Sequence, residues 1–369
     1  MSSPSRRSSN ASKIDVEGAE RGCWWIREVT RFGQRGDRLL VGEVGRRHRL
    51  LALAAAVLVL AASIVVIRMA WFRHPTTFYG LDVPDNDPAT IISLTRQTGY
   101  RPQVLNVFVA LDSPGFAPAT LTRISRMGAK PMITLEPWSW RSSWGQADQA
   151  QFSLAALASG QWDPNLRRIA KIVHGYQGLV YVRFAHEMNG WWYPWAESVN
   201  GNRSGGYVRA WRHVHDLFHN VGATNVRWIW SPNALTASPK GTADLAALYP
   251  GDEYVDILGM TAYGHGASAA HTFDATLKAL KAIAHKQIII SETGADGPDK
   301  TKWITSFGHY LNSHAEIDGF VWFNTTPSTT GASGDYRFDD TRENLAAFRD
   351  TLRKANITSQ VDTAPTVGP

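Results

Sequence analysis

The chain has 369 residues, of which 44% are hydrophobic and 19% are charged, so it is neither disordered nor fibrous. A single cysteine, Cys23, excludes a disulfide framework and any metal site built from several cysteines. The net charge of +6 is confined to the N-terminal quarter: residues 1–49 hold 11 Lys and Arg against 6 Asp and Glu, whereas from residue 74 onward 25 basic residues face 26 acidic ones. We therefore expect no nucleic-acid partner.

The first recognisable element is an apolar run at residues 50–67, LLALAAAVLVLAASIVVI. As a helix it would measure roughly 27 Å at about 1.5 Å per residue, close to the thickness of the hydrocarbon core of a bilayer. The basic residues before the run outnumber Arg68, which follows it. The positive-inside rule then predicts a single-pass protein of the cell membrane, with residues 1–49 as a basic cytoplasmic tail and the C-terminal domain outside. Membrane lipid is the expected partner of residues 50–67.

Two other interpretations of the apolar run stay open at this stage, a cleaved signal peptide and a buried core helix. A leader of 49 residues is longer than the usual n-region of a signal peptide, and no clear A-x-A cleavage site follows Ile67. We expect a retained anchor, a short linker at residues 68–75, a catalytic domain at residues 76–357 and a disordered tail at residues 358–369.

From residue 76 onward, short β-rich runs alternate with amphipathic stretches. The predicted strands are Phe78–Val83, Val104–Leu111, Pro131–Glu136, Leu179–His186, Val226–Ser231, Val255–Tyr263, Gln287–Glu292 and Gly319–Asn324. Eight strands, each with a helix after it, predict a (β/α)8 barrel preceded by a transmembrane helix. The alternative is a doubly wound open sheet, but the segment after the first strand lacks the glycine-rich fingerprint of that fold.

Enzymes with the barrel fold carry their chemistry where the strands end. Carboxylates, amides and aromatic residues fall at these predicted positions: Asp82, Asp112, Glu136, Trp138, His186, Glu187, Ser231, Asn233, Tyr263, Glu292 and Trp322. No group of histidines and carboxylates among them has the spacing of a metal site. We therefore expect neither a metal nor a cofactor.

Two glutamates stand out among these strand ends. Glu187 ends the fourth predicted strand and Glu292 the seventh, and these strands face each other across an eight-stranded barrel. Glycoside hydrolysis needs such a pair, one carboxyl protonated and the other ionised. We expect burial near Trp191 and Trp192 to raise the pKa of Glu187, and hydrogen bonds from Tyr263 to hold Glu292 charged. The alternative for either glutamate alone is an ion pair, for example with Arg183.

The strings HEMNGWWYPW, WIWSPN, MTAYG and SETG, which surround these residues, resemble glycoside hydrolase family 26 within clan A of the (β/α)8 glycosidases. The resemblance covers residues 76–355. It implies that Glu187 is the acid/base with His186 as its neighbour, and that Glu292 is the nucleophile, hydrogen-bonded by Tyr263. It also implies a retaining mechanism, with the two carboxyls about 5–5.5 Å apart.

Aromatic and amide residues near the strand ends are candidates for substrate binding, because sugar rings stack on indoles. The candidates are Trp138, Trp192, Trp195, Asn233 and Trp322; the resemblance places Trp192 and Trp322 along the sugar site. Family members cleave β-mannans, mixed-linkage β-1,3-1,4-glucans or β-1,3-xylans, and the YPW string at residues 193–195 is more similar to the glucan-active ones.

The sequence thus predicts a monomeric, membrane-anchored, exported retaining β-glycosidase. Its substrate is expected to be a polysaccharide, either a mixed-linkage β-glucan or a β-mannan, cut at internal bonds. Two rivals remain at this stage. One is a non-catalytic polysaccharide-binding protein, and the other is a surface transglycosylase that uses the same two glutamates in exopolysaccharide processing.

Overall fold

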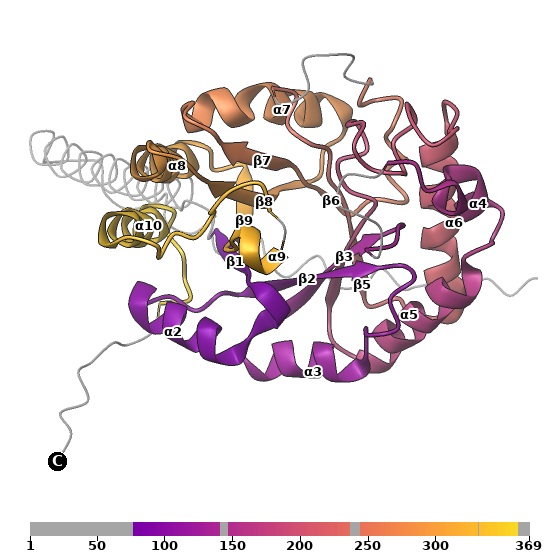
Figure 1. The fold of residues 1–369 in the computed structure, drawn as a ribbon, viewed down its shortest axis with the longest axis horizontal. Coiled ribbons are helices and arrows are strands. Elements are labelled where there is room, and N and C mark those ends of the chain that lie inside the picture. Colours follow the sequence, from indigo (N-terminus) through magenta and orange to yellow (C-terminus); the bar gives the residue numbers. More distant parts are fainter. Residues whose placement is uncertain (1–76, 141–146, 237–243, 331, 361–369) are drawn as a thin grey trace, which may run out of the picture. The chain divides into compact units, whose positions relative to one another are not determined.

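The strands of the protein form one parallel sheet that closes on itself (Figure 1). The computed structural model describes residues 77–140, 147–236, 244–330 and 332–360. Within them the strands are β1 (Phe78–Asp82), β2 (Val104–Ala110), β3 (Lys130–Glu136), β4 (Val180–Phe184), β5 (Val226–Trp230), β6 (Ile257–Leu258), β7 (Thr261–Gly264), β8 (Gln287–Ala295) and β9 (Ile317–Phe323). Their order in the sheet is β6-β5-β4-β3-β2-β1-β9-β8-β7, and pairing of β6 with β8 closes the barrel.

The sixth position of the barrel is shared by two short strands. β6 pairs with β5 and β8, and β7 continues the pairing with β8 after a break at Gly259. A Cβ at Gly259 would lie 2.7 Å from Ser291 Oγ and 2.8 Å from Ile229 Cγ2, so the neighbouring strands approach too closely for any side chain here. The barrel therefore has eight positions, and the predicted barrel architecture is confirmed.

The interior of the barrel is filled by a small apolar layer, and the helices cover the outside (Figure 1). Val104, Met132 and Val321 belong to the interior layer. The helices are α2 (Pro88–Thr98), α3 (Pro118–Arg126), α4 (Leu154–Ala158), α5 (Asp163–Tyr176), α6 (Gly206–Val221), α7 (Ala269–Ile283), α8 (Lys300–Ser313), α9 (Pro327–Thr330) and α10 (Arg342–Lys354), with 3-10 turns η1 (Pro84–Asn86) and η2 (Ala150–Phe152).

One expected helix is missing. The pattern predicts a helix after every strand, but the described residues between β5 and β6, 231–236 and 244–256, form turns and irregular structure. Tyr249 packs edge-on against Trp230 at a ring-centroid distance of 5.2 Å, which covers this side of the barrel. Pro250, together with Gly251 at φ 110°, disfavours a helix in the residues just before β6.

The C-terminal segment is ordered further than expected. Residues 358–360 were predicted to belong to a disordered tail, but Gln360 forms an antiparallel bridge with Tyr100, and Ser359 Oγ donates to the Arg101 carbonyl at 2.5 Å. Residues 361–369 lie outside the described part of the chain.

The predicted tail, anchor and linker at residues 1–49, 50–67 and 68–75 also lie outside the described residues. Among the helices that the structure does describe, none combines the length and the apolarity needed to cross a bilayer.

Candidate active site

The carboxyl ends of the strands surround a cleft of about 690 Å³. Four residues expected at the site line it: Glu187, Asn233, Tyr263 and Glu292. The wall also includes Asp82, Asp85, Asn86, Asn106, Phe108, Glu136, Trp140, Tyr193, His265, Phe323 and Tyr336. The two glutamates come from strands on opposite sides of the barrel, so the structure brings the predicted pair into one cleft.

Glu292 lies within β8 and is 7% exposed. Both of its carboxylate oxygens accept hydrogen bonds: Arg183 Nη2 donates to Oε2, and Tyr263 Oη donates to Oε1. Burial and the charge of Glu292 raise the pKa of Tyr263 well above its usual range, so the phenol keeps the proton that it donates. Glu292 is therefore held by two donors, one of them charged.

Arg183 is fully buried at the end of β4, where it forms an ion pair with Glu292. Its Nε donates to Thr134 Oγ1 at 3.0 Å and its Nη1 to Thr261 Oγ1 at 3.2 Å. Its guanidinium also lies 5.7 Å from the centre of the Phe108 ring. These contacts compensate for the free-energy cost of removing the cation from water. The sequence analysis left an ion pair with Arg183 open for either glutamate, and the structure shows it with Glu292.

Glu187 reaches the cleft through an unusual backbone conformation. β4 ends at Phe184, and both Ala185 (φ 44°) and Glu187 (φ 55°) lie in the left-handed region that favours glycine. The Glu187 amide donates to the Ser231 carbonyl at 2.8 Å, which fixes the turn against the segment after β5. Such conformations cost about 1 kcal/mol or more each and persist where the surroundings enforce them.

The environment of the Glu187 carboxyl favours its protonated form. Burial raises its pKa to about 7, with a further contribution from the negative charge of Glu292. Two hydrogen bonds oppose this shift: Trp192 Nε1 donates to Oε2 at 2.7 Å, and the Asn233 side chain forms the other. The two glutamates thus differ as an acid and a nucleophile must: the pKa of Glu187 is about 7, and Glu292 is held in an ion pair.

A reciprocal amide pair positions Asn233. Asn189 Nδ2 donates to the Asn233 carbonyl at 2.9 Å, and the Asn233 amide donates to Asn189 Oδ1 at 2.8 Å. The segment after β4 is thereby tied to the segment after β5. The sequence analysis did not single out Asn189, although it lies within the HEMNG string.

His186 belongs to the wall behind Glu187. Burial, and then the nearby Arg183 charge, lower its pKa well below the usual range, so the imidazole is neutral. Its ring lies 5.0 Å from that of Tyr193 and 5.9 Å from that of Trp195. Among the described residues, nothing hydrogen-bonds its Nδ1. His186 therefore supports the aromatic wall beside Glu187.

Two of the predicted substrate-binding tryptophans lie behind the cleft. Trp195 is fully buried, stacks on Tyr193 at 4.3 Å and donates its indole N–H to the His186 carbonyl at 2.6 Å. Trp138 is 2% exposed and meets the Tyr193 ring edge-on at 5.3 Å. Neither lines the cleft, so the expectation that they contact sugar is not met. They instead support Tyr193, which does line it.

Trp322 faces the opposite way from its expected position. It is fully buried, packs edge-on against Phe348 of α10 at 4.9 Å and donates to the Tyr336 carbonyl at 2.8 Å. Side chains alternate along a strand, and in β9 Val321 and Phe323 point into the barrel and its cleft. The prediction that Trp322 lines the sugar site is therefore wrong: it belongs to the core between the barrel and the helices.

Two further buried carboxyls, those of Asp82 and Glu136, line the cleft. The sequence analysis noted these residues only as strand ends. Burial raises the pKa of Asp82 to about 8 and that of Glu136 to about 7. Asn106 Nδ2 donates to Asp82 Oδ2 at 2.5 Å, and the two indoles of Trp138 and Trp140 donate to Glu136 Oε2 at 3.0 and 2.8 Å. In the part of the chain that the structure describes, no group of three or more His, Cys, Asp or Glu could hold a metal.

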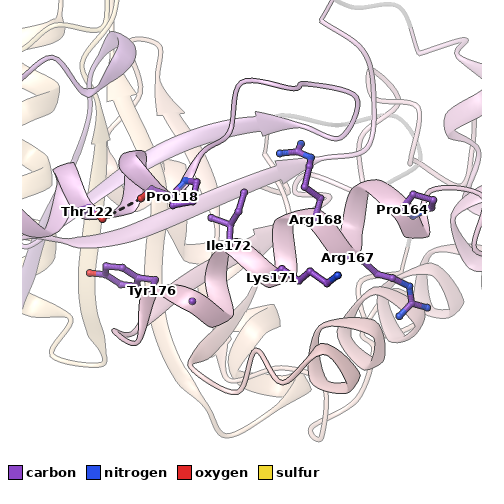
Figure 2. Close-up of a pocket in the computed structure, with 9 residues that line it drawn as sticks. Pro118, Thr122, Pro164, Arg167, Arg168, Lys171, Ile172 and Tyr176 are labelled. Atoms are coloured by element: carbon purple, nitrogen blue, oxygen red, sulfur yellow. Dashed lines mark hydrogen bonds between the residues drawn. The ribbon is translucent and has the colours of Figure 1, made fainter.

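A separate hollow of about 820 Å³ lies on the outer layer, lined by residues of α3 and α5 (Figure 2). Two of its three basic residues are engaged with the protein: Arg168 donates to the carbonyls of Phe116 and Ser113, and Arg167 pairs with Asp163. None of the predicted site residues lines it. The catalytic candidates belong to the cleft at the strand ends.

A parallel barrel with two carboxylates in one cleft at its carboxyl end is the arrangement of the (β/α)8 glycosidases. A family model described as glycosyl hydrolase family 26 matches residues 123–329. The chain belongs to this family.

The named relatives of the chain carry different enzyme names. Endoglucanase H of Acetivibrio thermocellus is 32% identical over 240 residues, which is 61% of this chain and 24% of that protein. A mannan endo-1,4-beta-mannosidase of Bacillus subtilis is 29% identical over 128 residues, 33% of this chain and 32% of that protein. The chain therefore spans about a quarter to a third of these relatives.

Solved structures show the same fold. That of a family 26 β-mannanase from Bacteroides ovatus has a TM-score of 0.61 at 16% identity and covers 78% of this chain and 91% of that one. A modular endo-β-1,4-mannanase from Cellulomonas fimi has a TM-score of 0.58 at 16% identity, with 78% and 74% covered.

Proposed function

We propose that the protein is a membrane-anchored, exported endo-β-glycosidase that retains anomeric configuration. The observation that supports this most directly is the contrast between the two glutamates of the cleft: Glu292 is paired with Arg183, whereas the pKa of Glu187 is raised to about 7. In this proposal Glu187 is the acid/base and Glu292 the nucleophile.

The reaction follows from these roles. Glu187 donates its proton to the glycosidic oxygen as a carboxylate oxygen of Glu292 attacks the anomeric carbon, so the C1–O bond breaks and a glycosyl ester forms. The Glu187 carboxylate then removes a proton from water, which attacks the same carbon and releases Glu292. Tyr263 and Arg183 hold the nucleophile before the first step.

For the substrate we propose a mixed-linkage β-1,3-1,4-glucan, with β-mannan as the second choice. The relative with the longest match described above carries the name endoglucanase, and the YPW string at residues 193–195 points the same way. Neutral β-linked sugars also suit a cleft whose described lining includes five Asp and Glu and neither Lys nor Arg.

The test uses the full chain in detergent micelles, as wild type and as Glu292→Gln. Both are incubated with barley β-glucan, glucomannan, galactomannan and β-1,3-xylan, and the products are resolved by chromatography. We expect wild type to shorten one polymer with retention at the new reducing end and Glu292→Gln to leave it intact. Equal cleavage by both would refute the assigned nucleophile, and no cleavage of any polymer would refute the proposed activity.

Anchoring is tested in cells that express the full chain. We expect the protein to sediment with membranes and to resist extraction with carbonate. Protease added to intact cells should digest the barrel domain. Deletion of residues 50–67 is the matched control. A full-length chain recovered quantitatively in the soluble fraction would contradict the proposed anchor.

A further inference from the structure

Among the described residues, hydrogen bonds to the side chain of Glu136, at the end of β3, reach only one of its two carboxylate oxygens. Both indole N–H donors, from Trp138 and Trp140, reach its Oε2. No donor among the described residues contacts its Oε1, although the carboxyl is 2% exposed and lines the cleft. A buried carboxyl oxygen normally has a hydrogen-bond partner. Because the carboxyl lines the cleft, a ligand bound there could supply a donor to Oε1.

Trp140 carries the second part of the arrangement. It lines the cleft and remains 44% exposed, although large exposed aromatics are uncommon. Its hydrogen bond to Glu136 fixes the edge of the ring and thereby the orientation of its faces. An indole held in this way offers an apolar plane to a pyranose ring, next to a carboxyl oxygen that accepts from a hydroxyl.

The charged residues that line the cleft around Glu136 and Trp140 limit which ligands can bind there. Asp82 and Asp85 line the same cleft as Glu136 and Trp140. Among the described lining residues there is neither Lys nor Arg, and the buried Arg183 is already paired with Glu292. A carboxylate on the ligand would find no cationic partner among these residues and would lose its hydration without compensation.

We propose that Glu136 and Trp140 form a sugar-binding subsite on the β3 side of the cleft. It takes a neutral β-linked hexosyl unit, which stacks on Trp140 and donates a hydroxyl to Glu136 Oε1, and it rejects a uronosyl unit. The proposal rests on the proposed function, because it assumes that a polysaccharide lies in this cleft.

The experiment measures binding, so that it does not depend on hydrolysis. The full chain in micelles carries Glu292→Gln, and calorimetry records its affinity for barley β-glucan and glucomannan, each used as such and after oxidation of C6 to the carboxylate. Trp140→Ala, Glu136→Ala and Glu136→Gln are compared on this background. Trp191→Ala, at an indole that is 66% exposed and does not line the cleft, and Glu253→Gln are the matched controls.

We expect at least one neutral polymer to bind, with affinity at least tenfold lower for Trp140→Ala and Glu136→Ala, a smaller loss for Glu136→Gln, and no change for the controls. Glu136→Gln keeps an acceptor for both indoles, so its loss reports on Oε1 alone. The oxidised polymers should bind at least tenfold more weakly. Undiminished binding by Trp140→Ala, equal binding of oxidised polymer, or no binding at all would overturn the subsite. Binding without cleavage by wild type would overturn the proposed function and leave the subsite standing.

Discussion

Arg183 and Glu292 form an ion pair at the base of the cleft, although 109 residues separate them in the sequence. The guanidinium is fully buried. Its Nε donates to Thr134 and its Nη1 to Thr261. A cation enclosed in this way stabilises a negative charge at one place and leaves little freedom for that charge to move. The pair therefore sets the position of the Glu292 carboxylate.

Arg183→Lys should be far from conservative. Lysine keeps the charge but cannot donate to Thr134, Thr261 and Glu292 together, because its donors share one nitrogen. We expect kcat to fall at least tenfold and the free energy of unfolding to fall by ~1–3 kcal/mol, the cost of leaving buried acceptors without a donor. Steady-state kinetics and denaturant unfolding check this. Wild-type kcat in the Lys variant would contradict the positioning role.

The pKa of Glu187 should respond to the charge of Glu292. Burial is the larger cause of its raised pKa, and the negative charge of Glu292 adds to it. Glu292→Gln removes that charge, so the pKa of Glu187 should fall below 7 while remaining above its ordinary 4.5. Carbon-detected NMR of the carboxyl resonances measures both values. An unchanged titration would mean that the two carboxyls are not electrostatically linked.

Trp192→Phe should move the same pKa in the opposite direction. The indole N–H donates to Glu187 Oε2 and lowers its pKa, so its loss should raise it. Because the acid must be protonated in the first step, activity declines as the pH rises past this pKa, and the alkaline limb should shift to higher pH. Trp191→Phe, at the neighbouring exposed indole, should leave the profile in place. A shift to lower pH, or equal shifts in both variants, would count against this hydrogen bond.

Asp82 should make the protein less stable at alkaline pH. Burial raises its pKa from 3.8 to about 8, so the folded state holds a proton that the unfolded chain has released. This contribution to stability is complete below about pH 4 and is lost as the pH rises toward 8. Wild type should therefore lose ~2–5 kcal/mol more than Asp82→Asn between pH 5 and 9. Denaturant unfolding at a series of pH values measures both curves, and parallel curves would refute the buried acid.

Trp322 offers a test of its position in the core. Trp322→Leu should lower the free energy of unfolding by ~3 kcal/mol, because a large buried ring and its hydrogen bond to Tyr336 are lost. Its KM for polysaccharide should stay within about twofold of wild type, because Trp322 does not line the cleft. A large rise in KM with unchanged stability would restore the role that the family resemblance suggested.

The barrel and the glutamate pair could be predicted because their signals are local and repeated. Each strand is a short β-rich run of its own, and Glu187 and Glu292 each close such a run. The rule that parallel strands end on one face then brings them together. The orientation of Trp322 had no such signal. The part of its strand that follows Asp318, GFVWF, is apolar throughout, so no alternation there distinguishes the face that holds Val321 from the face that holds Trp322.

Features that depend on residues distant in the sequence could not be predicted either. The break between β6 and β7 depends on how closely Ser291 and Ile229 approach Gly259, and the sequence around Gly259 shows neither neighbour. The partner of Arg183 was equally hidden. Glu187 lies only four residues away along the chain, but Arg183 points into the barrel, where Glu292 lies.

The left-handed conformation of Glu187 bears on how the enzyme can be improved. Its backbone favours glycine, and its carboxyl is desolvated beside another acid. Replacing it with glycine relieves both strains and removes the acid of the proposed reaction. Directed evolution that rewards heat tolerance alone will thus collect dead enzymes mutated at this position, so each round must also screen for turnover.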